Sequence, residues 1–177
     1  MTVNIPFCFL NQTARLSWTD IHYAISHDWI SPKVALEFSA YRLASPLDDL
    51  RDEELEFVRT TTDWQIIDLV EALANHEKVD EDEVQRKWLY IILSWVYANR
   101  ETLDEPLQMV EEIYADFNYP EAISTFVRYM PMTGPDLGNR PKCEERLYQY
   151  WLSYLVAEAV YWKRNMETES KFGGTHG

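Results

Sequence analysis

Hydrophobic residues recur every three to four positions along most of the chain, which is the spacing of amphipathic α-helices. The strict alternation of apolar and polar residues that marks a half-buried strand does not continue over five positions anywhere in the sequence. The best strand candidate, residues 5–10, is therefore a poor one. The pattern predicts an all-α protein, a single compact domain over residues 1–170 with seven or eight helices packed antiparallel through short loops. Residues 171–177 are expected to form a flexible C-terminal tail.

Capping residues indicate where several of these helices begin. Ser17 with Asp20 three residues later is close to a capping box and predicts a helix over about residues 18–27. Thr62 with Gln65 predicts a second capping box, for a helix over about residues 63–76. Its apolar stripe consists of Ile66, Ile67, Val70 and Leu73. The other predicted helices run from 32 to about 44, weakly after 46, from 80–83 to about 99, over about 107–117 and 121–129, and from about 141 onward.

The helix predicted from residues 80–83 to about 99 is the most apolar of the set. Its hydrophobic residues lie nearly all round its middle turns; they are Trp88, Leu89, Ile91, Ile92, Trp95 and Val96. A helix that is apolar on every side is typical of the interior of a protein. We therefore expect this helix to be the central one.

Length and composition fit a single folded domain outside any membrane. The chain has 177 residues, of which 46% are hydrophobic, and its seven Trp help to supply a core. Cys8 and Cys143 belong to no CxxC or zinc-site spacing, which fits a reducing compartment. The N-terminus lacks the basic region of a secretory signal, and no stretch reaches the roughly 18 apolar residues of a membrane span. These features predict a cytoplasmic protein with no membrane contact.

Acidic residues are the strongest indication of function. The net charge of −14 argues against nucleic-acid binding through a basic face. Residues 46–85 hold fourteen acids against three bases, and residues 101–121 hold seven acids and no base. Acids clustered on a rigid scaffold attract a basic protein partner, although solubility would also explain them. The partner-binding residues predicted from charge density are Asp48, Asp49, Asp52, Glu53, Glu54, Glu56, Asp80, Glu81, Asp82 and Glu83.

Sequence motifs for catalysis are missing. The chain has no Gly-rich phosphate loop, no GxSxG, no HExxH and no EF-hand spacing, and its four histidines are scattered. Glu112 and Asp116 are four residues apart and could place two carboxylates on one helical face, as carboxylate-dependent enzymes require. A solvated acidic face explains the same pair. We predict no catalytic residues, no metal ligands and no cofactor.

The stretch from Ile113 to Pro131, IYADFNYPEAISTFVRYMP, predicts a structural joint between two helices. Pro120 fits the first turn of the second helix, and the proline is expected to hold Tyr119 in an extended conformation. Arg128 is expected to pair with a carboxylate such as Asp116 or Glu112 and to lock the two helices together. The predicted joint residues are Asp116, Tyr119, Pro120 and Arg128.

Three strings within residues 87–131 resemble the bacterial domain-of-unknown-function 2247 family. They are WLY at 88–90, IYADFNYP at 113–120 and FVRYMP at 126–131, and residues 16–43 look similar to the opening helices of that family. The resemblance covers most of the chain without its tail. It supplies no catalytic residues to carry over. Proteins of this kind look like immunity proteins of bacterial polymorphic toxin and contact-dependent inhibition systems.

Charge and resemblance together favour a non-catalytic binding protein. The leading hypothesis is an immunity protein that occludes the active site of a basic toxin domain, such as a nuclease. Its specificity would come from a few aromatic anchors inside an acidic rim. Two alternatives stay open: an enzyme that uses carboxylates or a divalent metal, and a helical adaptor with no link to a toxin.

Overall fold

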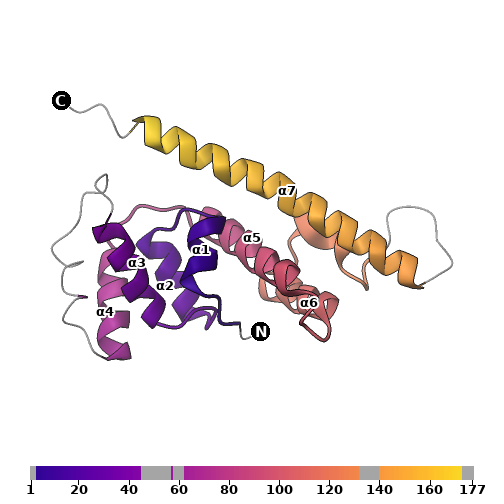
Figure 1. The fold of residues 1–177 in the computed structure, drawn as a ribbon, viewed down its shortest axis with the longest axis horizontal. Helices are drawn as coiled ribbons and strands as arrows, with labels where there is room; N and C mark the ends of the chain where they lie inside the picture. Colours follow the sequence, from indigo (N-terminus) through magenta and orange to yellow (C-terminus); the bar gives the residue numbers. More distant parts are fainter. Residues whose placement is uncertain (1–2, 45–56, 58–61, 132–139, 173–177) are drawn as a thin grey trace. The chain divides into compact units, whose positions relative to one another are not determined.

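The computed structural model describes residues 3–44, 57, 62–131 and 140–172 (Figure 1). All regular secondary structure in these residues is helical, which confirms the predicted all-α class. Within the described part of the chain, seven α-helices and one 3-10 helix agree with the seven or eight helices expected. They are α1 (Phe7–Thr13), α2 (Trp18–Ser26), α3 (Lys33–Leu43), α4 (Asp63–Ala74), α5 (Glu81–Asn99), α6 (Pro106–Asp116), η2 (Glu121–Phe126) and α7 (Arg140–Phe172).

Helix α1 occupies the segment that offered the best strand candidate. Pro6 stands at its N-cap, and the Pro6 carbonyl accepts hydrogen bonds from the N–H groups of Phe9 and Leu10. Leu10 is its one buried residue, while Phe7 packs by its edge on Phe38 and Tyr41. Apolar residues on two sides of so short a helix mimic the pattern of a strand, so periodicity alone could not identify it.

Element η2 is a shorter and tighter helix than the one predicted over residues 121–129. Ile123 and Phe126 are its buried residues. A 3-10 helix has three residues per turn, so residues three apart lie on the same side and both reach the core. Pro120 precedes the element as its N-cap, close to the position expected.

Packing within the chain separates two compact units, residues 2–88 and residues 89–177. The boundary lies inside α5, which contributes its first turns to the N-terminal unit and the rest to the C-terminal unit. The assignment of residues 1–170 to one domain stays a prediction. Helix α7 continues to Phe172, and the rest of the predicted tail lies outside the described residues.

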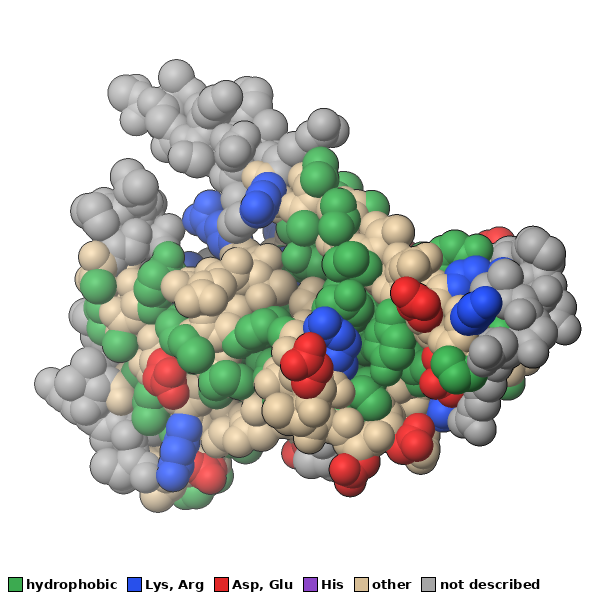
Figure 2. All heavy atoms as spheres, turned by 45° about the vertical axis from the view of Figure 1, so that its right-hand side comes forward, with side chains coloured by type: hydrophobic (Ala, Val, Ile, Leu, Met, Phe, Trp, Pro, Cys, Tyr) green, Lys and Arg blue, Asp and Glu red, His purple; other side chains and the backbone are tan. Residues whose placement is uncertain are grey.

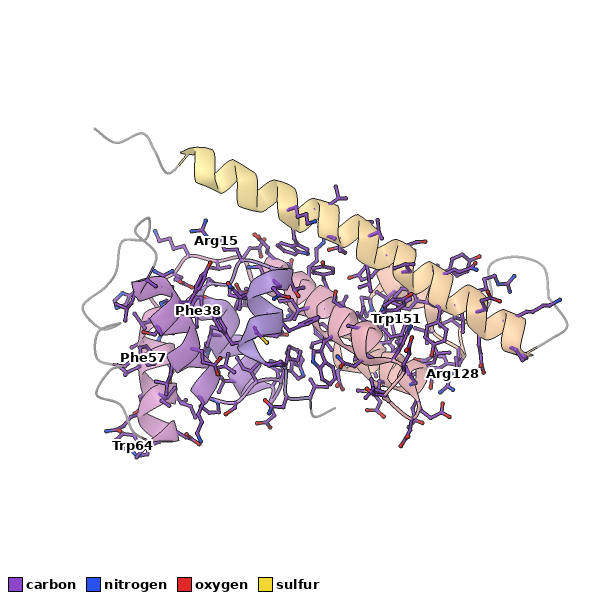
Figure 3. The ribbon with its side chains drawn as sticks, viewed as in Figure 1. Arg15, Phe38, Phe57, Trp64, Arg128 and Trp151 are labelled. Atoms are coloured by element: carbon purple, nitrogen blue, oxygen red, sulfur yellow. The ribbon has the colours of Figure 1, made fainter. Side chains whose placement is uncertain are left out.

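In the N-terminal unit, α4 packs against α2 and α3, and α3 also contacts α1. Trp18 is fully buried at the centre of this core. Its indole stacks on Phe57 at 5.1 Å between ring centroids and meets Phe38 edge-on at 4.8 Å. Aromatic pairs in these geometries add to the free energy of burial. Figure 3 shows Phe38 and Phe57 together within this group of helices.

In the C-terminal unit, α7 packs against η2. Trp151 of α7 is fully buried, with Phe126 stacked at 6.0 Å, Tyr148 stacked at 5.9 Å and Tyr97 edge-on at 5.1 Å. These contacts connect α5, η2 and α7 around one indole.

Helix α5 is buried on every side over its middle turns. The seven consecutive residues from Lys87 to Leu93 are all buried, which confirms the prediction of a central helix. Seven residues cover two helical turns, so no face of the helix in this stretch is left to solvent.

Helices α2 and α6 both end in Schellman motifs without glycine. In α2 the N–H of Asp28 bonds to the carbonyl of Ile25, and the N–H of Trp29 bonds to that of Ala24. Asp28 takes the left-handed conformation with φ of 56°. The first glycine of the sequence is at 134, so the left-handed positions of both motifs fall on residues that carry side chains.

A buried ion pair joins the start of α2 to α5. Asp20 completes the predicted capping box with Ser17, and its carboxylate Oδ2 also accepts a hydrogen bond from Lys87 Nζ at 2.7 Å. The indole Nε1 of Trp88 donates to the Asp20 carbonyl at 3.0 Å. Asp20 Oδ1 is buried with no hydrogen-bond partner in the described part of the chain. Burial raises the pKa of Asp20 above its ordinary value, against the opposing effect of the Lys87 ammonium.

Lys87→Met should lower the free energy of unfolding by about 3–5 kcal/mol near pH 7, because it leaves a buried carboxylate without its charge partner. Loss of the ammonium raises the pKa of Asp20 further. A raised carboxyl pKa contributes stability that is present below the ordinary pKa and is lost as pH rises through the folded-state pKa. The loss relative to the wild type should therefore be smaller near pH 5 than near pH 8.

Denaturant titrations at several pH values measure this difference. Asp20→Asn combined with Lys87→Met removes the titrating group and should abolish its pH dependence. A loss in the single variant that is the same at every pH would contradict the role given to the pair.

Candidate functional site

The acidic residues predicted to bind a partner fall into two groups. Asp48, Asp49, Asp52, Glu53, Glu54 and Glu56 lie outside the described residues. Asp80, Glu81, Asp82 and Glu83 are described, and all four are exposed at the start of α5. The Asp80 carboxylate accepts the N–H of Asp82 at 3.1 Å, so one of the four also caps the helix. Carboxylates at this end of a helix are stabilised by its dipole, which permits a dense acidic group there.

A nearby carboxylate, Glu77, serves the fold instead. Its oxygens accept hydrogen bonds from the N–H groups of Trp18 at 3.0 Å and Thr19 at 2.8 Å, and from the Thr19 hydroxyl at 2.7 Å. Glu77 therefore satisfies free N–H groups in the first turn of α2. Sequence reasoning missed this role, because the residues are 58 and 59 positions apart and no local pattern connects them.

Helix α4 presents an outer face that sequence reasoning also missed. Trp64 is 62% exposed and Ile67 is 37% exposed, and Asp68 and Glu71 are exposed beside them. We call these four residues the Trp64 face. Figure 3 shows Trp64 at one end of α4, at the edge of the N-terminal unit.

Ile67 was assigned to the buried stripe of this helix, and that assignment is wrong. The buried residues are Ile66, Val70 and Leu73. Ile67 follows Ile66 by one position, which is a rotation of about 100° around the helix and carries it off the buried side. Residues 66, 70 and 73 are spaced four and three positions apart, as on one side of a helix. This spacing could have shown from the sequence that Ile67 lies off that side.

Figure 2 shows acidic side chains singly or in small groups among hydrophobic ones, several of them with Lys or Arg beside them. Helix α4 differs in its charge, because it contains three acids and no Lys or Arg. An exposed Trp surrounded by carboxylates is suited to bind a basic surface that also offers an apolar pocket.

Arg128 forms an ion-pair lock with two carboxylates of the preceding segment, Glu111 and Glu105, and its contribution to the stability of the joint stays a prediction. Its Nε donates to Glu111 Oε1 at 2.8 Å and its Nη2 to Glu111 Oε2 at 3.3 Å, which is a bidentate pair. Its Nη1 donates to Glu105 Oε2 at 3.3 Å. Asp116 and Glu112, the two carboxylates named in the prediction, are exposed on α6, and the ion pairs of Arg128 are with Glu111 and Glu105.

Tyr119 is not extended, which corrects the prediction from the proline that follows it. Asn118 and Tyr119 both have φ of 59°. The N–H of Asn118 bonds to the Ala115 carbonyl and that of Tyr119 to the Tyr114 carbonyl, which forms the Schellman motif of α6. Asn118 is the left-handed residue that this motif requires, and Tyr119, which donates the longer-range of the two hydrogen bonds, adopts the same φ in spite of the preference for extended backbone before Pro120.

Three tyrosines gather beside this lock. Tyr119 and Tyr129 are 59% and 57% exposed, and both contact the buried Tyr114, at 5.3 Å and 6.2 Å between ring centroids. We call Tyr114, Tyr119 and Tyr129 the tyrosine surface. Desolvation raises the pKa of Tyr129, and the nearby Tyr114, Tyr119 and Glu111 raise it further.

Within the described residues, no group of three or more His, Cys, Asp or Glu side chains is arranged to hold a metal ion. Glu112 and Asp116, the pair considered for carboxylate chemistry, are exposed on α6. A search of the same residues finds no helix with the length and apolar character needed to cross a membrane.

Comparison with known protein families tests the family resemblance that the sequence suggested. The model of a family of uncharacterized proteins conserved in bacteria, DUF2247, matches residues 7–159. The chain belongs to the DUF2247 family. The match includes the buried Asp20–Lys87 pair, the Trp64 face and the tyrosine surface. No curated protein and no solved structure matches this DUF2247 chain, so the likeness to immunity proteins stays a prediction.

Arg128→Ala should lower the free energy of unfolding by about 1–3 kcal/mol, because it leaves the Glu111 carboxylate without its bidentate partner. The two carboxylates provide a matched comparison. Glu111 is 24% exposed, and Glu111→Gln should be clearly destabilising. Glu105 is 64% exposed, so solvent screens its pair and Glu105→Gln should cost at most about 1 kcal/mol. Thermal melting of the three variants measures how strongly each is destabilised. Equal effects of Glu111→Gln and Glu105→Gln would refute the larger contribution given to Glu111.

Proposed function

We propose that this DUF2247 chain is a non-catalytic acidic binding protein. In the specific form of the proposal, it is an immunity protein that occludes the active site of a basic bacterial toxin domain. The observation that carries the proposal is the Trp64 face, where an exposed Trp and Ile lie among exposed carboxylates.

The Trp64 face has the composition of a binding hot spot. Trp is among the residues that dominate binding energies at protein interfaces, and it acts most strongly where surrounding contacts exclude water. Exposed Trp64 and Ile67 leave apolar area that a partner would cover, which stabilises a complex by roughly 25 cal/mol per Å² of that area before the costs of association.

The charge around Trp64 selects the kind of partner. Asp68 and Glu71 flank the Trp on a helix without a base, in a protein of net charge −14. Such a field steers a positively charged protein toward the face and repels acidic ones. The exposed acids at 80–83 add to this field. The acids from Asp48 to Glu56 stay predicted interface residues.

A basic nuclease domain fits this chemistry, because its active-site cleft must be positive to hold phosphates. An acidic surface with an aromatic anchor can occupy such a cleft and displace the nucleic acid. Inhibition by occlusion needs no catalytic residue and no cofactor in the immunity protein.

The toxin partner is to be sought first as the protein encoded by the adjacent gene. Trp64→Ala should weaken binding to that protein by about thirtyfold, as expected when a hot-spot residue worth about 2 kcal/mol is removed. Tyr41→Ala is the matched control, since Tyr41 is also an exposed aromatic residue of the N-terminal unit, on α3. That variant should bind within about threefold of the wild type, inside the range of a near-neutral contact.

Co-purification followed by titration calorimetry measures both variants, and growth of cells that express the adjacent gene tests protection. Asp68→Lys with Glu71→Lys should slow association most at low ionic strength. The proposal fails if the wild-type chain neither binds the adjacent gene product nor protects cells from it.

A further inference from the structure

The tyrosine surface holds two large aromatic side chains at the surface of the C-terminal unit. Tyr119 is fixed by the hydrogen bonds of the Schellman motif and by its edge contact with Tyr114. Tyr129 contacts the same buried ring from the segment after η2. One buried ring therefore positions two exposed rings, so the surface is formed before any partner arrives and little ordering is needed on binding.

The backbone conformation of Tyr119 is unfavourable for a residue with a large side chain. Its φ of 59° lies in the left-handed region, where glycine is the least strained residue and asparagine is tolerated. The preceding residue has the same φ and is an asparagine, Asn118, which tolerates this conformation. The Schellman motif needs a left-handed residue only at Asn118, yet the chain also places a large aromatic ring in this conformation at 119 and leaves it mostly exposed. An exposed side chain retained against strain suggests a role outside the fold.

The charge beside these rings favours a cation. Arg128 is bound by two carboxylates, Glu111 and Glu105, so the lock carries one net negative charge. The Glu111 carboxylate also lies close enough to affect the pKa of Tyr129. The faces of tyrosine rings carry partial negative charge, so rings and carboxylates attract the same kind of group.

Arginine fits this surface better than lysine. A planar guanidinium stacks on an aromatic face and donates several hydrogen bonds, whereas an ammonium is a compact and strongly hydrated charge. The same unit already contains this contact, because Arg100 Cζ lies 4.3 Å from the centre of the Tyr97 ring.

We propose that the tyrosine surface binds arginine side chains of a basic segment in a partner protein. The guanidinium groups stack on Tyr119 and Tyr129 while the carboxylates of the lock balance their charge. Nucleobases also stack on aromatic rings, but the net negative charge here repels their phosphates. The inference goes beyond the function proposed above, because it concerns a different surface in the other unit and requires no toxin.

The probe for this inference is a short peptide of alternating arginine and glycine, titrated into the full chain at physiological ionic strength. NMR signals of the Tyr119 and Tyr129 rings should shift on addition of the peptide. Tyr119→Asn with Tyr129→Ser should weaken binding by about tenfold, as expected for two lost cation–π contacts. Asparagine keeps the left-handed backbone acceptable at 119, and Tyr129→Ser alone gives a second measurement outside any helix.

Three controls separate a specific site from general attraction to an acidic protein. Tyr41→Ser removes an exposed tyrosine of the N-terminal unit and should leave binding unchanged. A peptide with lysine in place of arginine should bind more weakly. Trp64→Ala should have no effect, so failure of this inference can be told from failure of the proposed function.

The inference is overturned if the tyrosine variants bind the arginine peptide as the wild type does. It is equally overturned if the lysine peptide binds as tightly as the arginine peptide, or if Tyr41→Ser weakens binding as much as the double variant. Shifts of the Tyr119 and Tyr129 signals on addition of a single-stranded oligonucleotide, with none from the peptide, would assign the surface to nucleic acid instead.

Discussion

The N-terminal unit depends on one buried carboxylate. Asp20 caps its own helix through Ser17, binds the Lys87 ammonium, and through its carbonyl holds the indole of Trp88. A buried charge is tolerated only where such partners compensate for the water it has lost. Lys87 is 67 residues from Asp20, so the pair also holds the Lys87 turn of α5 against the start of α2.

The acidity of the chain divides into carboxylates that the fold uses and carboxylates that stay at the surface. Glu77 caps α2 and Glu111 binds Arg128, so both serve packing in spite of belonging to acid-rich segments. The acids at 80–83 and those on the outer face of α4 are exposed. The density of charge along the sequence does not distinguish these two kinds of carboxylate. They can be told apart only by the contacts that each side chain makes in the structure.

Local patterns were sufficient to predict most of the helices. Caps and periodicity placed α2, the start of α6 and the central position of α5, since these depend on neighbours within a few residues. Long-range pairing was missed: the partner of Asp20, the cap supplied by Glu77 and the choice of Glu111 by Arg128 all depend on how helices meet. The conformation of Tyr119 was mispredicted because the preference imposed by the following proline was the only local signal considered, whereas the N–H of Tyr119 also takes part in closing α6.

Carboxylates occur both within the fold and on the Trp64 face. The two cases differ in whether the chain itself supplies a cation to the carboxylate. In the buried Asp20–Lys87 pair and the partly buried Glu111–Arg128 pair, the carboxylate has its cation within the chain. On the Trp64 face the indole and the carboxylates are present, but α4 contains no Lys or Arg. Electrostatic complementarity at interfaces pairs a surface of one sign with a partner of the other. A basic partner would supply from outside the cation that Asp20 and Glu111 obtain from the chain itself.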